Sequence, residues 1–241
     1  MPESASPEST SPVSLHFVGG EKGGVGKSLM ARVLAQYFID KQLPFKGFDT
    51  DKSHGALLRF YADYAAPVVI DRYEALDGVV EAVAQSRQRA LVDLAAQSHS
   101  MLTRWMEDSG VVDVASEIGV RLTYWHVMDA GRDSVDLLRK LLNQFGDRLR
   151  LVVVLNEVRG TEFEILKASG ELARAESLGA SIVSLRKLSD ATMQKIDQFS
   201  TSFWAASQSG DGSTTGLAMF ERQRIKVWLH KTYEQLDSLT V

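Results

Sequence analysis

Residues 20–28 read GEKGGVGKS, and this stretch gives the strongest prediction of the fold. It directly follows the apolar run SLHFV at 14–18, and apolar residues at helical spacing follow it between positions 29 and 38. Glycine allows the backbone to wrap closely around an anion, and the first N–H groups of a helix point toward bound phosphates. The stretch therefore predicts a phosphate-binding loop between a strand and a helix.

Two side chains at the end of this loop have expected roles. The ammonium of Lys27 should reach the β- and γ-phosphates of a nucleotide, and the hydroxyl of Ser28 should take one coordination position on Mg²⁺. The residues expected to bind the nucleotide here are Glu21, Lys22, Gly23, Gly24, Val25, Gly26, Lys27, Ser28 and Leu29.

The loop departs from the usual pattern G-x-x-x-x-G-K-[ST], because Glu21 stands at the position of the first glycine. Instead, KGGVGKS at 22–28 resembles the deviant Walker A motif of the ParA/MinD class of P-loop ATPases. In that class the early lysine, here Lys22, reaches across a dimer interface to the nucleotide of the other subunit. The resemblance implies ATP and Mg²⁺ as cofactors, catalytic roles for Lys22 and Lys27, and a homodimer in the ATP-bound state.

The composition excludes several kinds of site. The sequence has no cysteine, which removes disulfides, thiolate metal sites and iron–sulfur clusters. Its 241 residues, 44% of them hydrophobic, can bury a large core, and we expect one P-loop domain over 14–241 after a disordered tail over 1–13. The net charge of −4 argues against a general attraction to nucleic acid or to an anionic membrane. No apolar run approaches the roughly 20 residues that span a bilayer, and we expect a cytoplasmic protein without a membrane partner.

Short apolar runs alternate with longer stretches of helical spacing from residue 14 onward. This alternation is typical of βα units, and we expect an α/β fold with a twisted, mostly parallel sheet between two layers of helices. The predicted strands span 15–18, 45–48, 68–70, 90–94, 122–127, 149–155 and 181–185. The predicted helices include 78–86, 101–108, 133–145, 162–178 and 217–239, and a polar loop is expected at 207–216.

Two carboxylates, Asp49 and Asp51, follow the second predicted strand. In the class that the chain resembles, the second aspartate of this element lies near the attacking water and the magnesium shell. The resemblance therefore implies a catalytic and metal-binding role for Asp51, and support of the phosphate loop by Asp49. The customary Pro-Gln after the pair is replaced by Lys52-Ser53, and a solvated acidic turn is the alternative interpretation.

Asp93 ends the apolar run RALVD at 89–93, as the acid of a Walker B strand should. Such an aspartate binds Mg²⁺ through a water and offsets charge during phosphoryl transfer. Asp71, which follows VVI at 68–70, has a similar local pattern and is the competing candidate. Members of the class commonly carry a proline two residues after the acid, where Ala95 stands here, so the resemblance is to an outlying branch. The predicted metal ligands are Ser28, Asp51 and Asp93.

Asn156 closes the apolar strand LVVVL with an amide that can donate and accept a hydrogen bond. Relatives in the class place an asparagine here for the nucleotide base, with adenine or guanine left open, and an ordinary turn residue is the alternative. After the fifth predicted strand, Asp133 or Ser134 should cap a helix. Three histidines lack the spacing of metal ligands, and we expect structural or surface roles for them. They are His54, His99 and His126.

The last predicted helix combines an apolar stripe with Arg222, Arg224, Lys226 and Lys231. An amphipathic helix that docks on the sheet and keeps its basic face in water is the first interpretation. The second comes from DNA-partitioning members of the ParA/MinD class, whose ATP-bound dimers grip DNA nonspecifically through basic residues near the C-terminus.

Taken with the resemblance, these features predict a dimeric switch that binds ATP and hydrolyses it slowly with Mg²⁺. The expected setting is plasmid partitioning or positioning of a cellular cargo, with a protein partner that stimulates hydrolysis. An accessory ATPase of conjugative transfer or mobilisation is the alternative, because the substituted segments 51–53 and 93–95 look more like that divergent subgroup. Two further alternatives are an ATP-dependent synthetase with the same loop and a nucleotide-binding scaffold that no longer hydrolyses.

Overall fold

The computed structural model describes residues 13–20, 22–51, 55–208, 216–239 and 241. In this part of the chain, seven parallel strands form one sheet with the order β3-β2-β4-β1-β5-β6-β7. The strands are β1 (Val13–Gly19), β2 (Phe45–Asp49), β3 (Ala65–Pro67), β4 (Arg89–Asp93), β5 (Val120–Met128), β6 (Arg150–Asn156) and β7 (Ser181–Leu185).

β1 lies at the centre of the sheet between β4 and β5, and every one of its residues is buried. A strand of a parallel sheet is covered by helices on both faces, so its sequence reads as a continuous apolar run without alternation. The run before the phosphate loop therefore becomes the most deeply buried strand, and it holds that loop at a fixed place on the sheet.

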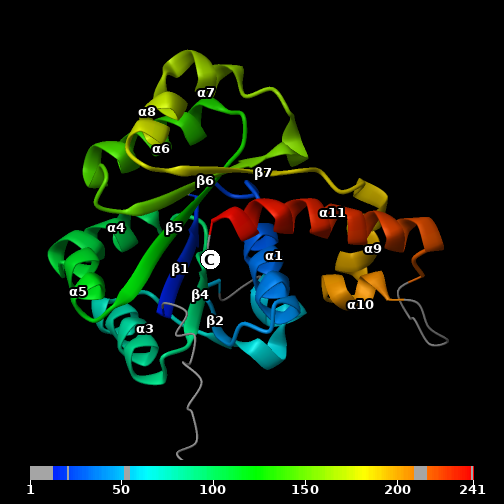
Figure 1. Cartoon of the computed structure of the whole chain (residues 1–241), viewed down its shortest axis with the longest axis horizontal. Helices are drawn as coiled ribbons and strands as arrows, with labels where there is room; N and C mark the ends of the chain where they lie inside the picture. Colours follow the sequence, from blue (N-terminus) through cyan, green and yellow to red (C-terminus); the bar gives the residue numbers. More distant parts are fainter. Residues whose placement is uncertain (1–12, 21, 52–54, 209–215, 240) are drawn as a thin grey trace, which may run out of the picture.

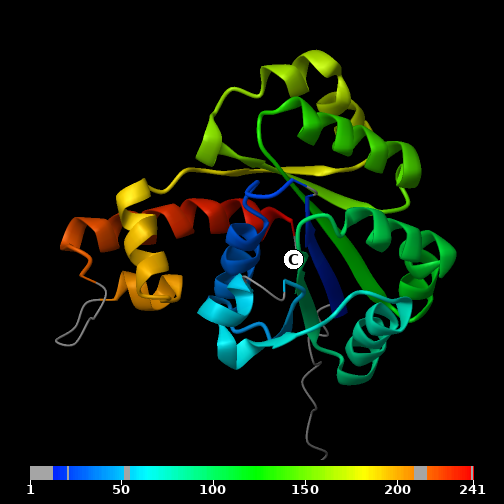
Figure 2. The ribbon, with the colours of Figure 1, turned by 180° about the vertical axis from the view of Figure 1, so that it is seen from behind.

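Helices cover both faces of the sheet, as Figure 1 shows and Figure 2 shows from behind. Each face has its own apolar core, so the molecule has the three layers that the sequence predicts. One core includes side chains of α3 (Tyr73–Ser86), α4 (His99–Asp108), α5 (Val111–Glu117), α6 (Arg132–Phe145), α7 (Glu164–Ser169) and α8 (Glu171–Ser177). The other includes side chains of α1 (Lys27–Asp40), α2 (Ala56–Phe60), α9 (Asp190–Gln198), α10 (Phe203–Ser207) and α11 (Met219–Ser238).

The third strand is not where the sequence predicts it. β3 comprises residues 65–67, at the edge of the sheet beside β2, and the apolar residues 68–70 follow it. Val68 and Ile70 pack against the core while Val69 is exposed, so these residues cover the core without pairing as a strand beyond the backbone bond from Val68 N to Asp49 O. The predicted strand at 68–70 is therefore wrong, because two of its three residues pack against the core from an irregular segment.

Other boundaries also differ from the predictions, and three of them change the interpretation of a segment. The predicted helix 162–178 is interrupted at Gly170, whose φ of 75° separates α7 from α8. Val13 is the buried first residue of β1 and not part of a tail, while residues 1–12 lie outside the described part of the chain. The predicted polar loop begins inside α10, and its residues 209–215 are likewise not described.

Among the described helices, none is both long enough and apolar enough to cross a membrane.

Candidate nucleotide-binding site

The carboxyl ends of the strands meet at one edge of the sheet because all the strands run parallel. β1 leads through the phosphate loop into α1, and its neighbours β4 and β5 end at the same edge. β2 and β6 also end there. Ligands of open α/β sheets bind in the crevice at this edge, so the residues that follow these five strands form the candidate site.

The phosphate loop ends at Gly26, which precedes α1 and has φ 99°, a left-handed conformation that favours glycine. No side chain caps α1, so its first N–H groups remain directed at the loop, where an anion can accept hydrogen bonds from them. Among the other predicted ligands, Gly23 and Gly24 are exposed, Val25 is buried, Leu29 is partly buried against the core, and Glu21 lies outside the described residues.

Lys27 is buried at the start of α1, with 7% of its surface exposed. Its Nζ donates a hydrogen bond to the backbone carbonyl of Lys22 at 3.2 Å. Burial lowers the pKa of Lys27, and the carboxylates of Asp93 and Asp51 act against that shift. The ammonium therefore lies in a weakly polar environment, where its attraction to a phosphate is much stronger than in water.

Asp93 ends β4 and is 2% exposed. Ser28 is near enough to lower the pKa of the Asp93 carboxyl, whose Oδ1 has no hydrogen-bond partner among the described residues. Burial and the neighbouring Asp49 raise the pKa of Asp93 to about 7, although Ser28 and Lys27 act in the opposite direction. A buried carboxylate with one unsatisfied oxygen beside a hydroxyl suits Mg²⁺, which prefers oxygen ligands and is commonly held by one or two protein groups with waters and phosphates.

Asp71, the competing candidate, is exposed in the segment after β3. Its carboxylate lies 3.7 Å from the guanidinium of Arg72, and both side chains are largely in solvent. Because residues 68–70 do not form a strand, Asp71 does not stand at the end of one. The structure therefore favours Asp93 as the Walker B acid.

The loop after β2 brings Asp51 to the site. Its charge acts on both Lys27 and Asp93. The buried Asp49 holds this loop, because its Oδ1 accepts the N–H of Asp51 at 3.0 Å and its Oδ2 accepts the N–H of Leu58 at 3.1 Å. With these bonds Asp49 supports Asp51 and the first turn of α2, whereas the resemblance implied support of the phosphate loop. Lys52 and Ser53 lie outside the described residues.

Thr50 joins the ends of β2 and β4, and sequence reasoning missed it. Its hydroxyl donates to the carbonyl of Asp93 at 3.1 Å and accepts the N–H of Ala95 at 2.7 Å. A proline at position 95 has no N–H, so it could not make the second bond. The alanine that stands in place of the usual proline therefore makes this hydrogen bond possible. In the sequence, the only sign of Thr50 was its place between the carboxylates of Asp49 and Asp51.

Lys22 is paired within its own chain. Its Nζ lies 3.1 Å from Oδ2 of Asp129, which directly follows β5 and is 5% exposed. Oδ1 of Asp129 accepts hydrogen bonds from the hydroxyl of Ser134 at 2.7 Å and from the N–H of Gly131 at 3.1 Å. Burial would raise the pKa of Asp129, but the hydrogen bonds from Ser134, Gly131 and Lys22 outweigh it and lower the pKa.

The predicted cap of α6 is wrong in its detail. Gly131 occupies the N-cap position and no side chain caps the helix. The hydroxyl of Ser134 is directed to Asp129 instead, and Asp133 lies in the first turn. The pairing of Asp129 with Lys22 was not predicted, because the two residues are 107 positions apart in the chain.

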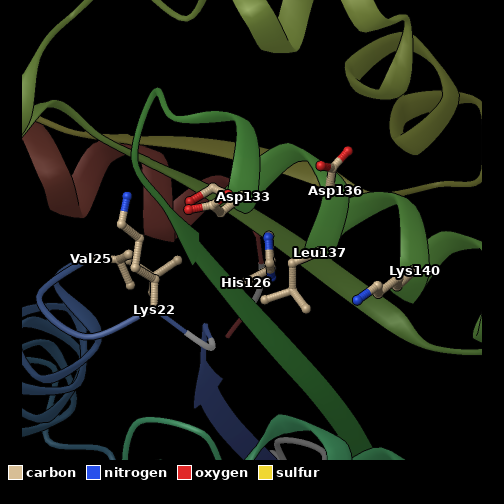
Figure 3. A pocket seen from close by; sticks show the side chains of 9 residues that line it. Lys22, Val25, His126, Asp133, Asp136, Leu137 and Lys140 are labelled. Carbon is tan, nitrogen blue, oxygen red and sulfur yellow. The ribbon is translucent and has the colours of Figure 1, made fainter.

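A cavity of about 500 Å³ lies beside the phosphate loop. In Figure 3, Lys22 and Val25 come from the loop on one side and Asp133 and Lys140 from α6 on the other. His126 also lines it, and burial lowers the pKa of this imidazole to about 4, so the ring is neutral near neutral pH.

Two of the three histidines named in the sequence are buried. His99 is buried with its Nδ1 3.3 Å from the hydroxyl of Tyr124, His126 is fully buried, and His54 lies outside the described residues. The described chain holds no cluster of three or more His, Cys, Asp or Glu side chains that could bind a metal by themselves.

Asn156 ends β6 and contacts the phosphate loop. Its Nδ2 donates to the carbonyl of Val25 at 2.6 Å, and its Oδ1 accepts the N–H of Val158 at 3.2 Å. The side chain thus ties β6 to the loop, a positioning role that the sequence did not predict. Contact between Asn156 and a nucleotide base stays a prediction.

The four basic residues of α11 do not form one patch. Arg224 and Lys231 are seven residues apart and line a groove of about 340 Å³ together with Arg186 and Lys187. Arg222 and Lys226 are four residues apart, share a different face of the helix, and do not line that groove. The groove also has an apolar lining that includes Phe220, Val227 and Trp228.

Comparison with known proteins finds no matching family model. The chain is 28% identical over 244 residues to Protein TraL of Escherichia coli, which covers 94% of this chain and 98% of that protein. A second Protein TraL of Escherichia coli is 26% identical over 250 residues with the same coverage. Protein MobD of Acidithiobacillus ferrooxidans is 24% identical over 189 residues, covering 76% of this chain and 82% of that protein. The chain therefore has relatives of nearly its own length.

Similarities to solved structures are weaker. A nucleotide-binding protein from Archaeoglobus fulgidus in complex with ADP has a TM-score of 0.46 and 14% identity, and covers 77% of this chain and 86% of that one. A signal recognition particle 54 kDa protein from Aeropyrum pernix in complex with GDP has a TM-score of 0.47 and 17% identity, and covers 98% and 51%. At these values the neighbours support no statement about the ligand of this chain, and the site must be argued from its own residues.

Proposed function

We propose that this chain binds ATP with Mg²⁺, forms a dimer around two nucleotides, and hydrolyses ATP slowly as a switch in conjugative transfer or mobilisation of DNA. The observation that carries the proposal is the cluster of Lys27, Ser28 and Asp93 beneath a glycine-rich loop at the carboxyl edge of the sheet. The similarity to TraL and MobD proteins along most of the chain favours the transfer setting over plasmid partitioning.

In this proposal Ser28 and Asp93 hold Mg²⁺, and Asp51 orients the attacking water. The metal supplies positive charge that offsets the charge of the phosphoryl group during transfer. Lys27 is buried and already near two carboxylates, so little reorganisation is needed when a phosphate replaces the backbone carbonyl that it contacts now.

The pair between Lys22 and Asp129 bears on dimer formation. For Lys22 to reach the nucleotide of a second subunit, its ammonium must leave Asp129, to which it is 3.1 Å away in the single chain. Because 40% of the Lys22 side chain is exposed, solvent screens the pair, and the buried Asp129 keeps its hydrogen bonds from Ser134 and Gly131 when the lysine leaves. ATP in the second subunit then competes with Asp129 for the same lysine.

Molar mass in solution tests the proposal. We expect light scattering to show a dimer with ATP or a nonhydrolysable analogue, and a monomer with ADP. Lys22→Ala should bind ATP but stay monomeric, whereas Lys167→Ala, which changes an exposed lysine on α7, should behave like the wild type. A wild-type chain that binds ATP and remains a monomer would overturn the dimeric switch and favour the synthetase alternative, for which the cavity of about 500 Å³ would be the second substrate site.

DNA contact through α11 is a second property that we propose. The groove lined by Arg186, Lys187, Arg224 and Lys231 has no acidic side chain in its lining, in a chain with a net charge of −4. Lys187 is engaged 2.8 Å from Asp190, which leaves the arginines and Lys231 as the principal candidates for DNA phosphates. The dependence of DNA affinity on salt concentration tests this contact.

A further inference from the structure

The segment that follows β6 contacts the phosphate loop at two points. β6 ends at Asn156, and a short helical turn, η2 (Glu157–Arg159), comes next. A Cβ placed on Gly26 would lie 2.1 Å from Nδ2 of Asn156, and a Cβ placed on Gly24 would lie 2.6 Å from Nη2 of Arg159. Gly26 is therefore required by the buried Asn156 as well as by its φ of 99°, whereas Gly24, with φ 75°, lies against the movable end of Arg159.

The position of Arg159 is set by its neighbours. Asn156 is buried, and its amide is bonded both to Val25 of the loop and to Val158 of η2. The turn is closed by a bond from the N–H of Gly160 to the carbonyl of Glu157 at 3.3 Å. The backbone before Arg159 is thus tied to the loop, and its long side chain extends across Gly24.

The charge of Arg159 is not offset by a carboxylate in the part of the chain that the structure describes. Arg159 and Gly24 are both exposed, so the guanidinium lies on the outer face of the loop. Lys27 is buried beneath the same loop. The loop therefore has the ammonium of Lys27 on one side and the guanidinium of Arg159 on the other. Of these two cations, only the guanidinium has the forked geometry that suits a phosphate.

We propose that Arg159 binds the phosphates of the nucleotide from the outer face of the loop. The inference rests on the proposed nucleotide site and adds to it a phosphate ligand from β6, outside the glycine-rich motif. Its contact is with the β- and γ-phosphates and not with the base, because the guanidinium lies over Gly24 within the loop that surrounds those phosphates.

The test compares the binding of AMP, ADP and ATP to Arg159→Ala, Arg159→Lys and the wild type by titration calorimetry. Loss of a hydrogen bond to a charged group should weaken ATP and ADP binding about 10- to 100-fold in Arg159→Ala and leave AMP binding unchanged. Arg159→Lys should keep part of the affinity. Arg148→Ala is the matched control, because Arg148 is an exposed arginine that donates to the carbonyl of Gln144 away from the site.

Three outcomes would overturn the inference. Equal ATP affinity in Arg159→Ala and the wild type would show that the guanidinium is not a ligand. An equal loss for AMP, ADP and ATP would assign it to the base, the ribose or the α-phosphate, which the three nucleotides share. A wild-type chain that binds none of the three nucleotides, with Lys27→Ala no different, would overturn the proposed nucleotide site and this inference together. Thermal unfolding of each variant shows whether a loss of binding reflects a loss of fold.

Discussion

The phosphate-loop edge and the groove along α11 both gather charged side chains, but they hold them in different ways. At the loop edge, Lys27 is 7% and Asp93 2% exposed, and each is bonded to a neighbour. Along α11, Arg224 and Lys231 are exposed next to Phe220 and Val227, which are 67% and 42% exposed. The first region holds charge in a weakly polar environment, and the second holds it in solvent.

This difference determines how strongly each region can act on a ligand. Charges in a weakly polar environment interact several times more strongly than charges in water, and salt screens them less. The loop edge is therefore suited to a small, highly charged ligand at a fixed position. The α11 groove is suited to a large partner that contributes many weak contacts. Substitutions in each of the two regions test this contrast.

Lys27→Ala should give the largest effect. We expect ATP affinity to fall by about 100-fold or more, because the variant removes a buried cation from the phosphates. Lys167→Ala, on the surface of α7, is the control. Fluorescence titration with a labelled ATP analogue measures the change. Near-normal affinity in Lys27→Ala would mean that burial of this cation contributes nothing to binding, and the contrast between the two regions would fail.

Asp93→Asn should change how stability depends on pH. The folded pKa of Asp93 is raised to about 7, so the folded chain binds an extra proton between pH 4 and 7 and loses stability as pH rises through that range. The buried His16 and His126 have lowered pKa values, about 3 and about 4, and oppose this trend below about pH 6.5.

Both the wild type and Asp93→Asn contain those histidines, so their contribution cancels in the difference between the two unfolding free energies. Measured by urea unfolding from pH 5 to 8, Asp93→Asn should become more stable relative to the wild type as pH rises. Mg²⁺ with ATP should reduce that advantage, because the cation stabilises the ionised carboxylate. A pH-independent difference would show that Asp93 is already ionised at low pH and that burial does not control it.

Asp129→Asn should favour the ATP-bound dimer by a smaller amount. The amide keeps an oxygen that can accept from Ser134 and Gly131, but it loses the charge that holds Lys22. Since the pair is partly exposed, we expect the dimer dissociation constant with ATP to fall about 2- to 5-fold. Analytical ultracentrifugation measures it. A weaker dimer would mean that Asp129 positions Lys22 for the second subunit and does not withhold it.

The double variant Arg224→Gln/Lys231→Gln should give the smallest effect, and one that depends on salt. If both residues contact DNA phosphates, the slope of log affinity against log salt should decrease in magnitude by about 2. Arg222→Gln/Lys226→Gln removes the same charge from the other face of α11 and is the matched control. Fluorescence anisotropy with a random duplex measures both. Equal slopes for the two variants would mean that the groove has no special part in DNA binding.

The groove and the loop edge also differ in how well the sequence predicted them. The loop and the place of Asp93 at a strand end followed from local rules, because glycine conformation and the end of an apolar run are properties of adjacent residues. The basic residues of α11 were correctly predicted to lie on a helix, and their spacing divides them between two faces, but the pair that borders a groove is set by the packing of that helix in the fold. Thr50 was missed although it lies between two residues that were named.

The α/β class, the phosphate loop and the acids at the ends of β2 and β4 could be predicted from the sequence, because each depends on the chemistry of neighbouring residues. The pairing of Lys22 with Asp129, the bonds by which Thr50 joins two strand ends and the position of Arg159 over Gly24 depend on the three-dimensional fold. Those partners are 43 to 135 residues apart in the chain. The order of parallel strands in the sheet brings them together, and periodicity within a single segment contains no information about that order.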